Sequence, residues 1–262
     1  MRWDERQRAM LREIGVHAWW PVDDGVATEE RPAVEAREDA APAIVPGREP
    51  PPAVPRAAAE PGVAAGLDWP ALRAAVAACT ACPLSGSRRQ TVFGVGHEQA
   101  HWMIVGEAPG EQEDREGEPF VGKSGQLLDN MLRAIGLTRG AAEPARQVFI
   151  ANTLKCRPPG NRNPAPDELA QCESFLIRQV QLVQPRIILA MGAFAVQSLL
   201  RSSEPVGRLR GRVHRYQGVP LIVTYHPAYL LRNPVDKAKA WDDLCLAVET
   251  AAATAATSTS AP

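Results

Sequence analysis

The chain has 262 residues, of which 45% are hydrophobic, 5% aromatic and 23% charged, and its formal net charge is −1. This length accommodates one α/β domain of ordinary size plus an extension. No stretch approaches the roughly 20 apolar residues of a membrane helix, and residues 1–20 lack the apolar centre of a signal peptide. We therefore expect a cytoplasmic protein that is not inserted in a membrane.

The N-terminal region divides into two parts. Its start reads WDERQRAMLREIGVHAWWP, a pattern typical of a short amphipathic docking helix followed by exposed tryptophans. Residues 21–66 contain nine of the 24 prolines and show no apolar period, so they cannot bury enough surface to offset chain entropy. We expect a docking helix in 1–20, a disordered linker in 21–66, a folded domain in 67–250 and a disordered tail in 251–262.

The charge is unevenly distributed along the chain. Residues 1–66 hold 8 basic and 12 acidic residues, which leaves 21 basic and 18 acidic residues for the remainder. This slight positive excess is compatible with a local nucleic-acid groove but does not require one, since a patch matters more than a total.

From Trp102 onward, short apolar runs alternate with amphipathic ones, which is typical of a parallel sheet covered by helices. The predicted strands are residues 102–105, 148–151, 186–190, 212–216 and 220–224. The predicted helices are residues 124–135, with Ser124 as N-cap and Gly136 as stop, 167–183, 192–200 and 236–249. Ligands of such sheets bind beyond the carboxyl ends of the strands, where polar loops start at Gly106, Asn152 and His226.

Four of the five cysteines form two pairs, Cys79 with Cys82 and Cys156 with Cys172. A Cys-x-x-Cys pair can hold a metal on a single turn, whereas folding must bring the second pair together. In a reducing compartment, four clustered cysteines are metal ligands more often than two disulfides. Their spacing alone is compatible with zinc or with a [4Fe-4S] cluster.

Taken singly, the loop at Gly106, Asn152 and His226 are each common as turn or cap residues. Together with the cysteines they resemble the family 4 uracil-DNA glycosylases, the iron-sulfur branch of that superfamily. The resemblance runs from about Cys79 to Glu249 and rests on GEAPGEQED (106–114), EPFVGKSGQLLD (118–129), NTLKCRPPGNRNP (152–164) and HPAYLLR (226–232). It implies a three-layer α/β/α fold with a central, mostly parallel four-stranded sheet, and a [4Fe-4S] cluster on Cys79, Cys82, Cys156 and Cys172.

The resemblance also implies how the base is read. Uracil presents a donor at N3 and an acceptor at O4, and the Asn152 carboxamide matches both, whereas cytosine reverses them. Phe120 becomes the stacking platform of a base flipped out of the duplex, although a core phenylalanine is the plainer interpretation. Glu113 becomes the group that excludes the methyl group of thymine.

Two residues receive catalytic roles from the resemblance. His226 donates a hydrogen bond to O2 of the departing base, where negative charge develops. Glu107 positions water or stabilises the positive charge on the sugar. Other branches use an Asp or Asn of this motif to activate water, whereas this chain has Ala108 beside Glu107, so the identity of a general base stays open. Ala108, and the lack of a basic insertion around VGKSGQ, argue against the branch that cross-links to DNA.

Several side chains are candidates for contact with DNA. After His226, Tyr229 and Leu230 offer an apolar wedge and Arg232 a cation, although a buried helix start is an equally good interpretation. Three loop cations are candidates for phosphate contacts, unless they are simply solvated: Lys155, Arg157 and Arg162.

The sequence thus predicts a monomeric enzyme that flips uracil out of DNA and hydrolyses its N-glycosidic bond, leaving an abasic site for base excision repair. The start of the chain weakly resembles the psi subunit of bacterial DNA polymerase III, which implies attachment of residues 1–20 to the clamp loader or another replisome protein. The alternatives are a non-catalytic DNA-binding or replisome adaptor and a zinc-stabilised regulatory domain. An intact set of Glu107, Phe120, Asn152 and His226 favours the enzyme.

Overall fold

The computed structural model describes residue 13 and residues 64–259, with residues 255–259 described by their backbone alone. The predicted docking helix in 1–20 and the predicted linker in 21–66 therefore fall outside the description, apart from residues 13 and 64–66. Within the described residues, no helix combines the length and the apolar character that a membrane crossing requires.

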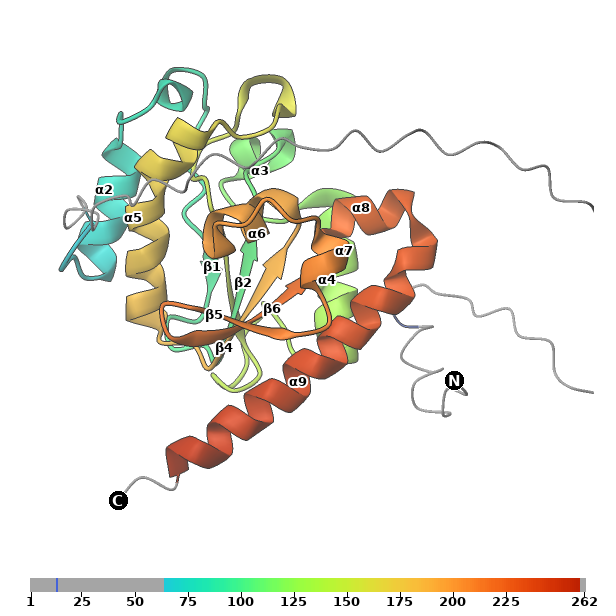
Figure 1. The fold of residues 1–262 in the computed structure, drawn as a ribbon. Coiled ribbons are helices and arrows are strands. Elements are labelled where there is room, and N and C mark those ends of the chain that lie inside the picture. The colour runs from blue at the N-terminus through green and yellow to red at the C-terminus, as the bar shows by residue number, and fades with distance from the viewer. Residues whose placement is uncertain (1–12, 14–63, 260–262) are drawn as a thin grey trace, which may run out of the picture. The chain divides into compact units, whose positions relative to one another are not determined.

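A six-stranded sheet forms the centre of the domain (Figure 1). The strands are β1 Val95–Gly96, β2 Trp102–Gly106, β3 Val148–Asn152, β4 Ile187–Met191, β5 Val213–Tyr216 and β6 Val219–Thr224, in the spatial order β1-β3-β2-β4-β6-β5. The central strands β3, β2, β4 and β6 are parallel, and β1 and β5 pair antiparallel at the edges. Every residue of β2, β3 and β4 is buried, as expected for a parallel sheet covered on both faces.

The predicted count of four strands is wrong, because the sheet has six. The antiparallel edge strand β5 coincides with the predicted strand 212–216, whereas the other edge strand, β1, was not predicted. Strand β1 has two residues, and Gly94 and Gly96 beside and within it have positive φ angles. A Cβ atom at Gly96 would overlap the Val148 carbonyl oxygen, so this position excludes the side chains that normally indicate a strand.

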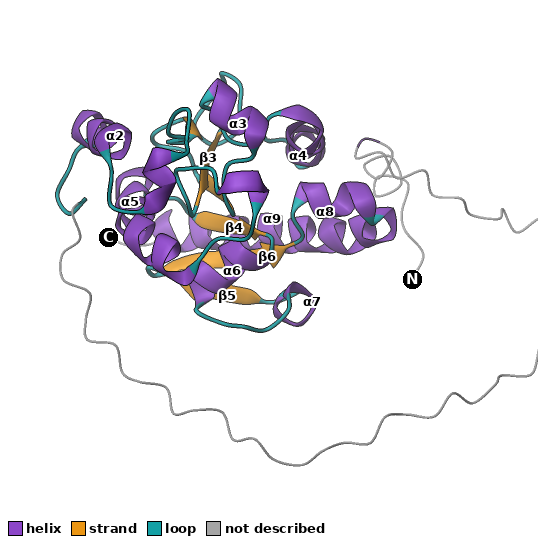
Figure 2. Cartoon of the chain, turned by 90° about the horizontal axis from the view of Figure 1, so that it is seen from above, coloured by secondary structure: helices purple, strands orange, loops and turns teal. Residues whose placement is uncertain are grey.

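The helices cover both faces of the sheet (Figures 1 and 2). They are α2 Trp69–Ala78, α3 Glu111–Glu116, α4 Gly122–Ala134, α5 Pro166–Val183, α6 Ala193–Leu200, α7 Val206–Leu209, α8 Pro227–Arg232 and α9 Lys237–Thr259, with single 3₁₀ turns at Pro83–Gly86, Pro159–Asn161 and Pro234–Asp236. One core cluster joins α2, α5, α6 and α7 to the sheet, and a second joins α4, α8 and α9 to its other face. The expected three-layer α/β/α fold is confirmed.

Two predicted helix limits are wrong. Helix α4 begins at Gly122 with Val121 as its N-cap, two residues before the predicted start at Ser124. Helix α9 continues to Thr259, so the predicted disordered tail does not hold for residues 251–259. This last stretch is rich in alanine, which has the highest intrinsic helix propensity.

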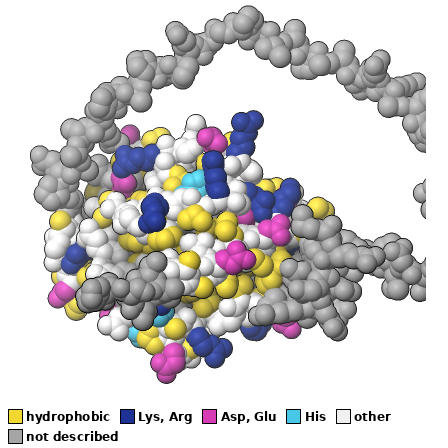
Figure 3. Space-filling view, turned by 60° about the horizontal axis from the view of Figure 1, so that its bottom comes forward, with side chains coloured by type: hydrophobic (Ala, Val, Ile, Leu, Met, Phe, Trp, Pro, Cys, Tyr) yellow, Lys and Arg dark blue, Asp and Glu magenta, His cyan; other side chains and the backbone are white. Residues whose placement is uncertain are grey.

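One face of the domain carries hydrophobic side chains across its middle, with lysine, arginine and carboxylate side chains interspersed around them (Figure 3). Among the described residues, the large hydrophobic side chains that are exposed are Val213, Leu231, Val235 and Val248. Side chains of both charge signs occur on the part of this face that the picture shows.

Helix α9 is attached to the rest of the domain by a buried ion pair. The fully buried Asp243 carboxylate accepts a hydrogen bond from Arg210 Nε on Oδ2 at 3.0 Å, and its Oδ1 lies 3.0 Å from Arg210 Nη2 in the same ion pair. Burial raises the pKa of Asp243 to about 6, and the Arg210 guanidinium opposes this shift. Arg210 also donates to the Lys239 carbonyl oxygen, so the segment after α7 is bonded to two turns of α9.

We expect Asp243→Ala to lower the free energy of unfolding by about 3–5 kcal/mol, because it leaves the largely buried Arg210 without its counter-charge. Guanidinium denaturation followed by circular dichroism measures this change. Asp242→Ala removes an exposed carboxylate from the same helix turn. It should change the free energy by less than about 0.5 kcal/mol. Equal effects of the two substitutions would contradict an anchoring role for the pair.

Candidate active site

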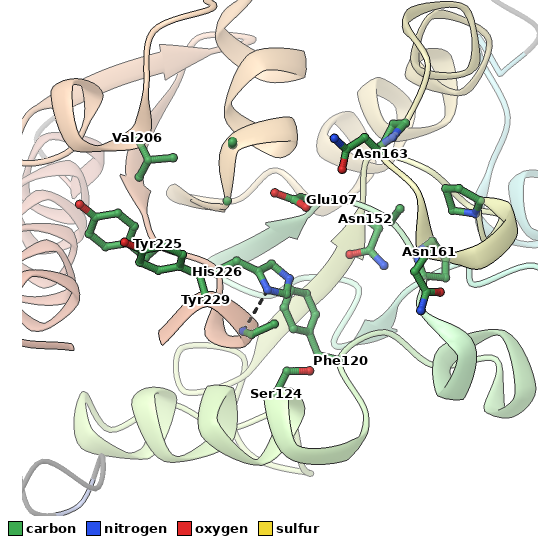
Figure 4. Close-up of a pocket in the computed structure, with 18 of the residues that line it drawn as sticks. Glu107, Phe120, Ser124, Asn152, Asn161, Asn163, Val206, Tyr225, His226 and Tyr229 are labelled. Carbon is green, nitrogen blue, oxygen red and sulfur yellow. Dashed lines mark hydrogen bonds between the residues drawn. The ribbon is translucent and has the colours of Figure 1, made fainter. Parts of the chain in front are cut away.

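A cavity of about 770 Å³ lies where β2, β3 and β6 end, at the carboxyl edge of the parallel strands. It is lined by the following residues that the sequence singled out: Glu107, Glu113, Phe120, Asn152, Arg162, His226, Tyr229 and Arg232. Figure 4 shows Glu107, Asn152 and His226 facing a common space, with Phe120 beside the His226 ring. Glu107 and Arg232, 125 positions apart in the sequence, thus line one site.

Asn152 is the last residue of β3 and is 3% exposed. The parallel register places it opposite Gly106, the last residue of β2. A Cβ atom at Gly106 would lie 2.5 Å from both Asn152 Oδ1 and Phe120 Cζ. Position 106 therefore has to be glycine if the carboxamide and the edge of the aromatic ring are to converge.

The loops that follow β2 and β3 are hydrogen-bonded to each other. The main-chain N–H groups of Thr153 and Leu154 donate to the carbonyl oxygens of Gly106 and Glu107, at 3.0 and 3.1 Å. The Thr153 hydroxyl also donates to the Glu107 carbonyl oxygen, at 2.5 Å. These bonds continue the strand pairing beyond the sheet and fix Asn152 relative to Glu107.

Phe120 has a left-handed backbone, with φ at 54°, and its side chain is 4% exposed. A residue with a Cβ atom adopts this conformation at a cost of about 1–3 kcal/mol, so the surrounding structure has to hold it. The Phe120 ring stacks on the His226 ring, with centroids 5.1 Å apart and an interplanar angle of 23°. Arg139 Nη1 donates to the Pro119 carbonyl oxygen at 3.1 Å and holds the chain just before it.

Glu113 holds the chain just after Phe120. Its Oε1 accepts from Val121 N and its Oε2 from Gly110 N, both at 3.0 Å. Each carboxylate oxygen is therefore bonded to main chain of the loops that form the cavity wall. The structure places Glu113 at the cavity, where it braces these two loops.

His226 is the N-cap of α8, and its Nδ1 accepts the main-chain N–H of Ala228 at 3.1 Å (Figure 4). Burial lowers the pKa of His226 to about 4, and the nearby Arg232 charge adds to this effect. The imidazole is therefore neutral near pH 7. Because Nδ1 accepts, the proton of the neutral ring resides on Nε2, which is the donor available to a ligand.

Glu107 lies at the N-terminus of α6. Its Oε1 accepts the main-chain N–H of Phe194 at 3.2 Å. Burial raises the pKa of Glu107, and the hydrogen bonds from the main chain of Phe194 and Ala193 oppose the shift. Gly192, with φ at 95°, makes room for this arrangement, because a Cβ atom there would overlap Glu107 Oε1 and lie 3.1 Å from His226 Cβ.

The predicted apolar wedge is partly wrong. Leu230 is 1% exposed and belongs to the hydrophobic core, so it cannot insert into DNA while α8 is folded. The next residue, Leu231, is 42% exposed. The Tyr229 ring stacks on Tyr225 at 5.0 Å, and its hydroxyl donates to Asp236 at 2.7 Å.

The three loop cations occupy different environments. Lys155 is 1% exposed and its Nζ donates to protein oxygens, so the interpretation as a phosphate contact is wrong. Arg157 donates to Asn161 at 2.7 Å and lies 3.6 Å from Glu111, outside the cavity lining. Arg162 lines the cavity and forms a two-pronged pair with the Glu168 carboxylate, at 2.5 and 2.9 Å.

The four paired cysteines line a second, narrow cavity between α2, the turn after it and α5. None of them forms a disulfide. Arg88 Nη1 donates to Cys156 Sγ at 3.1 Å, and the main-chain N–H of Lys155 lies 3.3 Å from Cys172 Sγ. Among the described residues, no three histidine, cysteine or carboxylate side chains converge where a single metal ion could bind. The thiols surround a space, with hydrogen-bond donors of the kind that stabilise thiolates.

Sequence reasoning missed several residues of the first cavity: Ser124, Asn161, Asn163, Tyr225 and the segment 205–207. Ser124, Asn161 and Asn163 stand inside the quoted motifs, where their polar side chains were the available signal. The segment 205–207 is the N-cap and first two residues of α7 and carries no polar side chain, so its position at the cavity follows from the tertiary fold alone.

We expect the His226 ring to titrate with a pKa of about 4 and to carry its proton on Nε2 above that pH. Long-range proton–nitrogen NMR spectra report both properties, and His226→Gln assigns the signals. Since the unfolded chain takes up the proton near pH 6.5, this residue's contribution to stability declines as the pH falls from 6.5 to about 4. A pKa near 6.5, or a proton on Nδ1, would contradict this assignment.

Comparison with known proteins agrees with this geometry. Residues 93–245 match the model of the Uracil DNA glycosylase superfamily. The chain is 40% identical over 167 residues to the type-4 uracil-DNA glycosylase of Archaeoglobus fulgidus. This alignment covers 61% of this chain and 81% of that protein. The type-4 uracil-DNA glycosylase of Thermotoga maritima is 42% identical, in an alignment that covers 59% of this chain and 79% of that protein. The type-4 uracil-DNA glycosylase of Pyrobaculum aerophilum is 40% identical, over 69% of this chain and 93% of that protein. The chain therefore belongs to the type-4 branch of the uracil DNA glycosylase superfamily.

Proposed function

We propose that this protein removes uracil from DNA by flipping the nucleotide into the larger cavity and hydrolysing its N-glycosidic bond. The observation that carries this proposal is the convergence of Glu107, Phe120, Asn152 and His226 in a space of about 770 Å³. A base in a duplex cannot reach such a cavity while it is stacked, so flipping is required at a cost of about a few kcal/mol. The product is an abasic site, the substrate of the later steps of base excision repair.

Asn152 is the proposed reader of the base. Its carboxamide accepts from N3 of uracil and donates to O4, and cytosine offers the opposite pattern. Because Asn152 is 3% exposed, a mismatched base would leave its polar atoms without water as a substitute partner. A site of this kind discriminates by up to about 10⁴–10⁵.

His226 is the proposed donor to O2 of the leaving base. The neutral ring presents Nε2–H, which stabilises the uracil anion more than the neutral base. Loss of such a preorganised donor lowers the rate by about 10²–10³. Phe120, which stacks on His226, supplies the apolar surface against which the flipped ring lies.

Glu107 faces the same cavity and is the proposed second catalytic group. In its ionised form it suits the positive charge that develops on the sugar or positions a water molecule, while the main-chain N–H of Phe194 holds its Oε1. Glu113, held by Gly110 and Val121, sets the wall that we propose excludes the thymine methyl group.

The proposed contacts with DNA come from α8 and from the loop after β3. Arg232 and Tyr229 both line the cavity, and Arg232 is exposed. Leu231 replaces Leu230 as the proposed wedge, because it is the exposed leucine of α8. Arg157 and Arg162 stay proposed phosphate contacts, and residues 1–20 the segment proposed to attach to a replisome protein.

We further propose that Cys79, Cys82, Cys156 and Cys172 hold a [4Fe-4S] cluster. Such a cluster takes one thiolate on each iron, so its ligands surround a body several atoms wide rather than converge on a point. The shared cavity and the N–H groups directed at two of the thiols support this fit. When bound, the cluster supplies a structural link between the loop after α2, the loop after β3 and α5.

We expect Asn152→Ala to lower the rate of uracil release from a uracil-containing oligonucleotide by at least about 10²-fold, because the base loses the pair of bonds that orients it. Release of free uracil by the purified protein is measured by chromatography. Asn130→Ala, which removes a carboxamide from α4 away from the cavity, serves as the control and should retain full activity. No release by the unmodified, iron-loaded protein would favour the adaptor alternative.

We expect the protein purified without oxygen to contain about four iron and four sulfide ions per chain. Cys172→Ser should lose most of both, since it removes one of the four corner ligands. Cys245→Ser should keep them, because Cys245 lies on α9 and does not line the cysteine cavity. A colourless protein with one zinc ion per chain would refute the cluster and support the zinc alternative.

A further inference from the structure

Lys155 lies between the base-reading residue and the cysteine cavity. Its side chain is 1% exposed, and residues 148–156 around it are all buried. A buried ammonium group is costly unless its donors are satisfied. Here Nζ donates to the main-chain carbonyl oxygen of Asn152 at 2.8 Å and to Gln179 Oε1 at 2.7 Å. The long side chain thus folds back on the end of its own strand.

Gln179 fixes the far side of the ammonium group. It is fully buried on α5, and its Nε2 donates to the Phe93 carbonyl oxygen at 2.9 Å. With both ends of the carboxamide bonded, its oxygen is held in place to receive Lys155. The chain of bonds runs from Phe93 through Gln179 and Lys155 to Asn152.

The main chain of Lys155 faces the cysteines. Its N–H lies 3.3 Å from Cys172 Sγ, the next residue is Cys156, and Lys155 itself lines the cysteine cavity. One residue therefore contacts both sites, with its N–H at a thiol of one and its ammonium group at the main chain of the other.

We propose that Lys155 is a positioning residue for base reading, which holds the main chain of Asn152 in register with Gly106 from an anchor at the cysteine cavity. This inference rests on the proposed function, because it needs Asn152 to read uracil. It assigns Lys155 no contact with DNA or with the base. The side chain of Asn152 starts from the same Cα atom as its main-chain carbonyl group. Holding that carbonyl group therefore also holds the carboxamide in its orientation.

Arg88 provides a matched comparison. It is a second cation at the cysteine cavity, and its hydrogen bonds go to Cys156 Sγ and to the Ala77 carbonyl oxygen. Loss of Arg88 removes a cation from the cysteines and leaves the Asn152 carbonyl bond in place. If Lys155 merely balanced the charge of the thiolates, the two substitutions would have the same effect.

The test compares Lys155→Met with Arg88→Met as iron-loaded protein, with uracil release expressed per loaded molecule. We expect Lys155→Met to lower kcat by about 10²-fold, as a misplaced group does, and Arg88→Met to stay within about threefold of the unmodified protein. The second readout is affinity for DNA carrying uracil on a 2′-fluorinated, uncleavable sugar relative to uracil-free DNA. Lys155→Met should lose this preference while its affinity for uracil-free DNA is unchanged.

Equal kcat values and equal base preference in the two variants would overturn the inference, while the proposed function would stand. No uracil release by the unmodified protein would instead overturn the proposed function. If Lys155→Met does not load iron, Gln179→Met decides the question, because it removes the other acceptor of the ammonium group and leaves every cysteine and Lys155 in place. We expect Gln179→Met to lower kcat by about tenfold. If Gln179→Met leaves both kcat and the preference for uracil unchanged, the inference is overturned.

Discussion

The five consecutive residues 152–156 must satisfy two sites at once, and the arrangement of the domain follows from this constraint. Asn152 ends a buried strand in register with Gly106, and Cys156 lies in the wall of the cysteine cavity. Between them, Thr153 and Leu154 donate to the loop after β2, and the Lys155 side chain returns to Asn152. A shift of one residue in this segment would displace Asn152, the proposed base reader, and a thiol together.

Helix N-termini set the chemistry of the two proposed catalytic groups. Glu107 accepts a main-chain N–H at the start of α6, and His226 accepts one at the start of α8. A helix N-terminus favours an acceptor or a negative charge, so it supports an ionised Glu107 and a His226 ring with a bare Nδ1. Burial also lowers the pKa of His226 and so favours the same neutral ring. Burial raises the pKa of Glu107 and so opposes the effect of the helix N-terminus there.

Much of the fold could be predicted from the sequence, because buried parallel strands are short apolar runs and the polar loops after them occur in order. The edge strand β1 could not, since its pairing is permitted by Gly96 rather than driven by side chains that favour strands. Leu230 and Lys155 were predicted to contact DNA but are buried, and the reason again lies in tertiary packing. A leucine of a short helix is buried or exposed according to what packs on it, and an inward-facing lysine needs an acceptor such as Gln179, which lies 24 residues later.

Pro227 gives the His226 tautomer an origin in the main chain. Proline lacks an N–H group, so the first donor that α8 offers to the imidazole is that of Ala228, and Nδ1 meets a single main-chain partner at this helix end. The position of one proton on the ring is thereby decided before any nucleic acid arrives. The Nδ1 atom, which carries the proton in the other neutral form of the ring, is held as an acceptor by the main chain of α8.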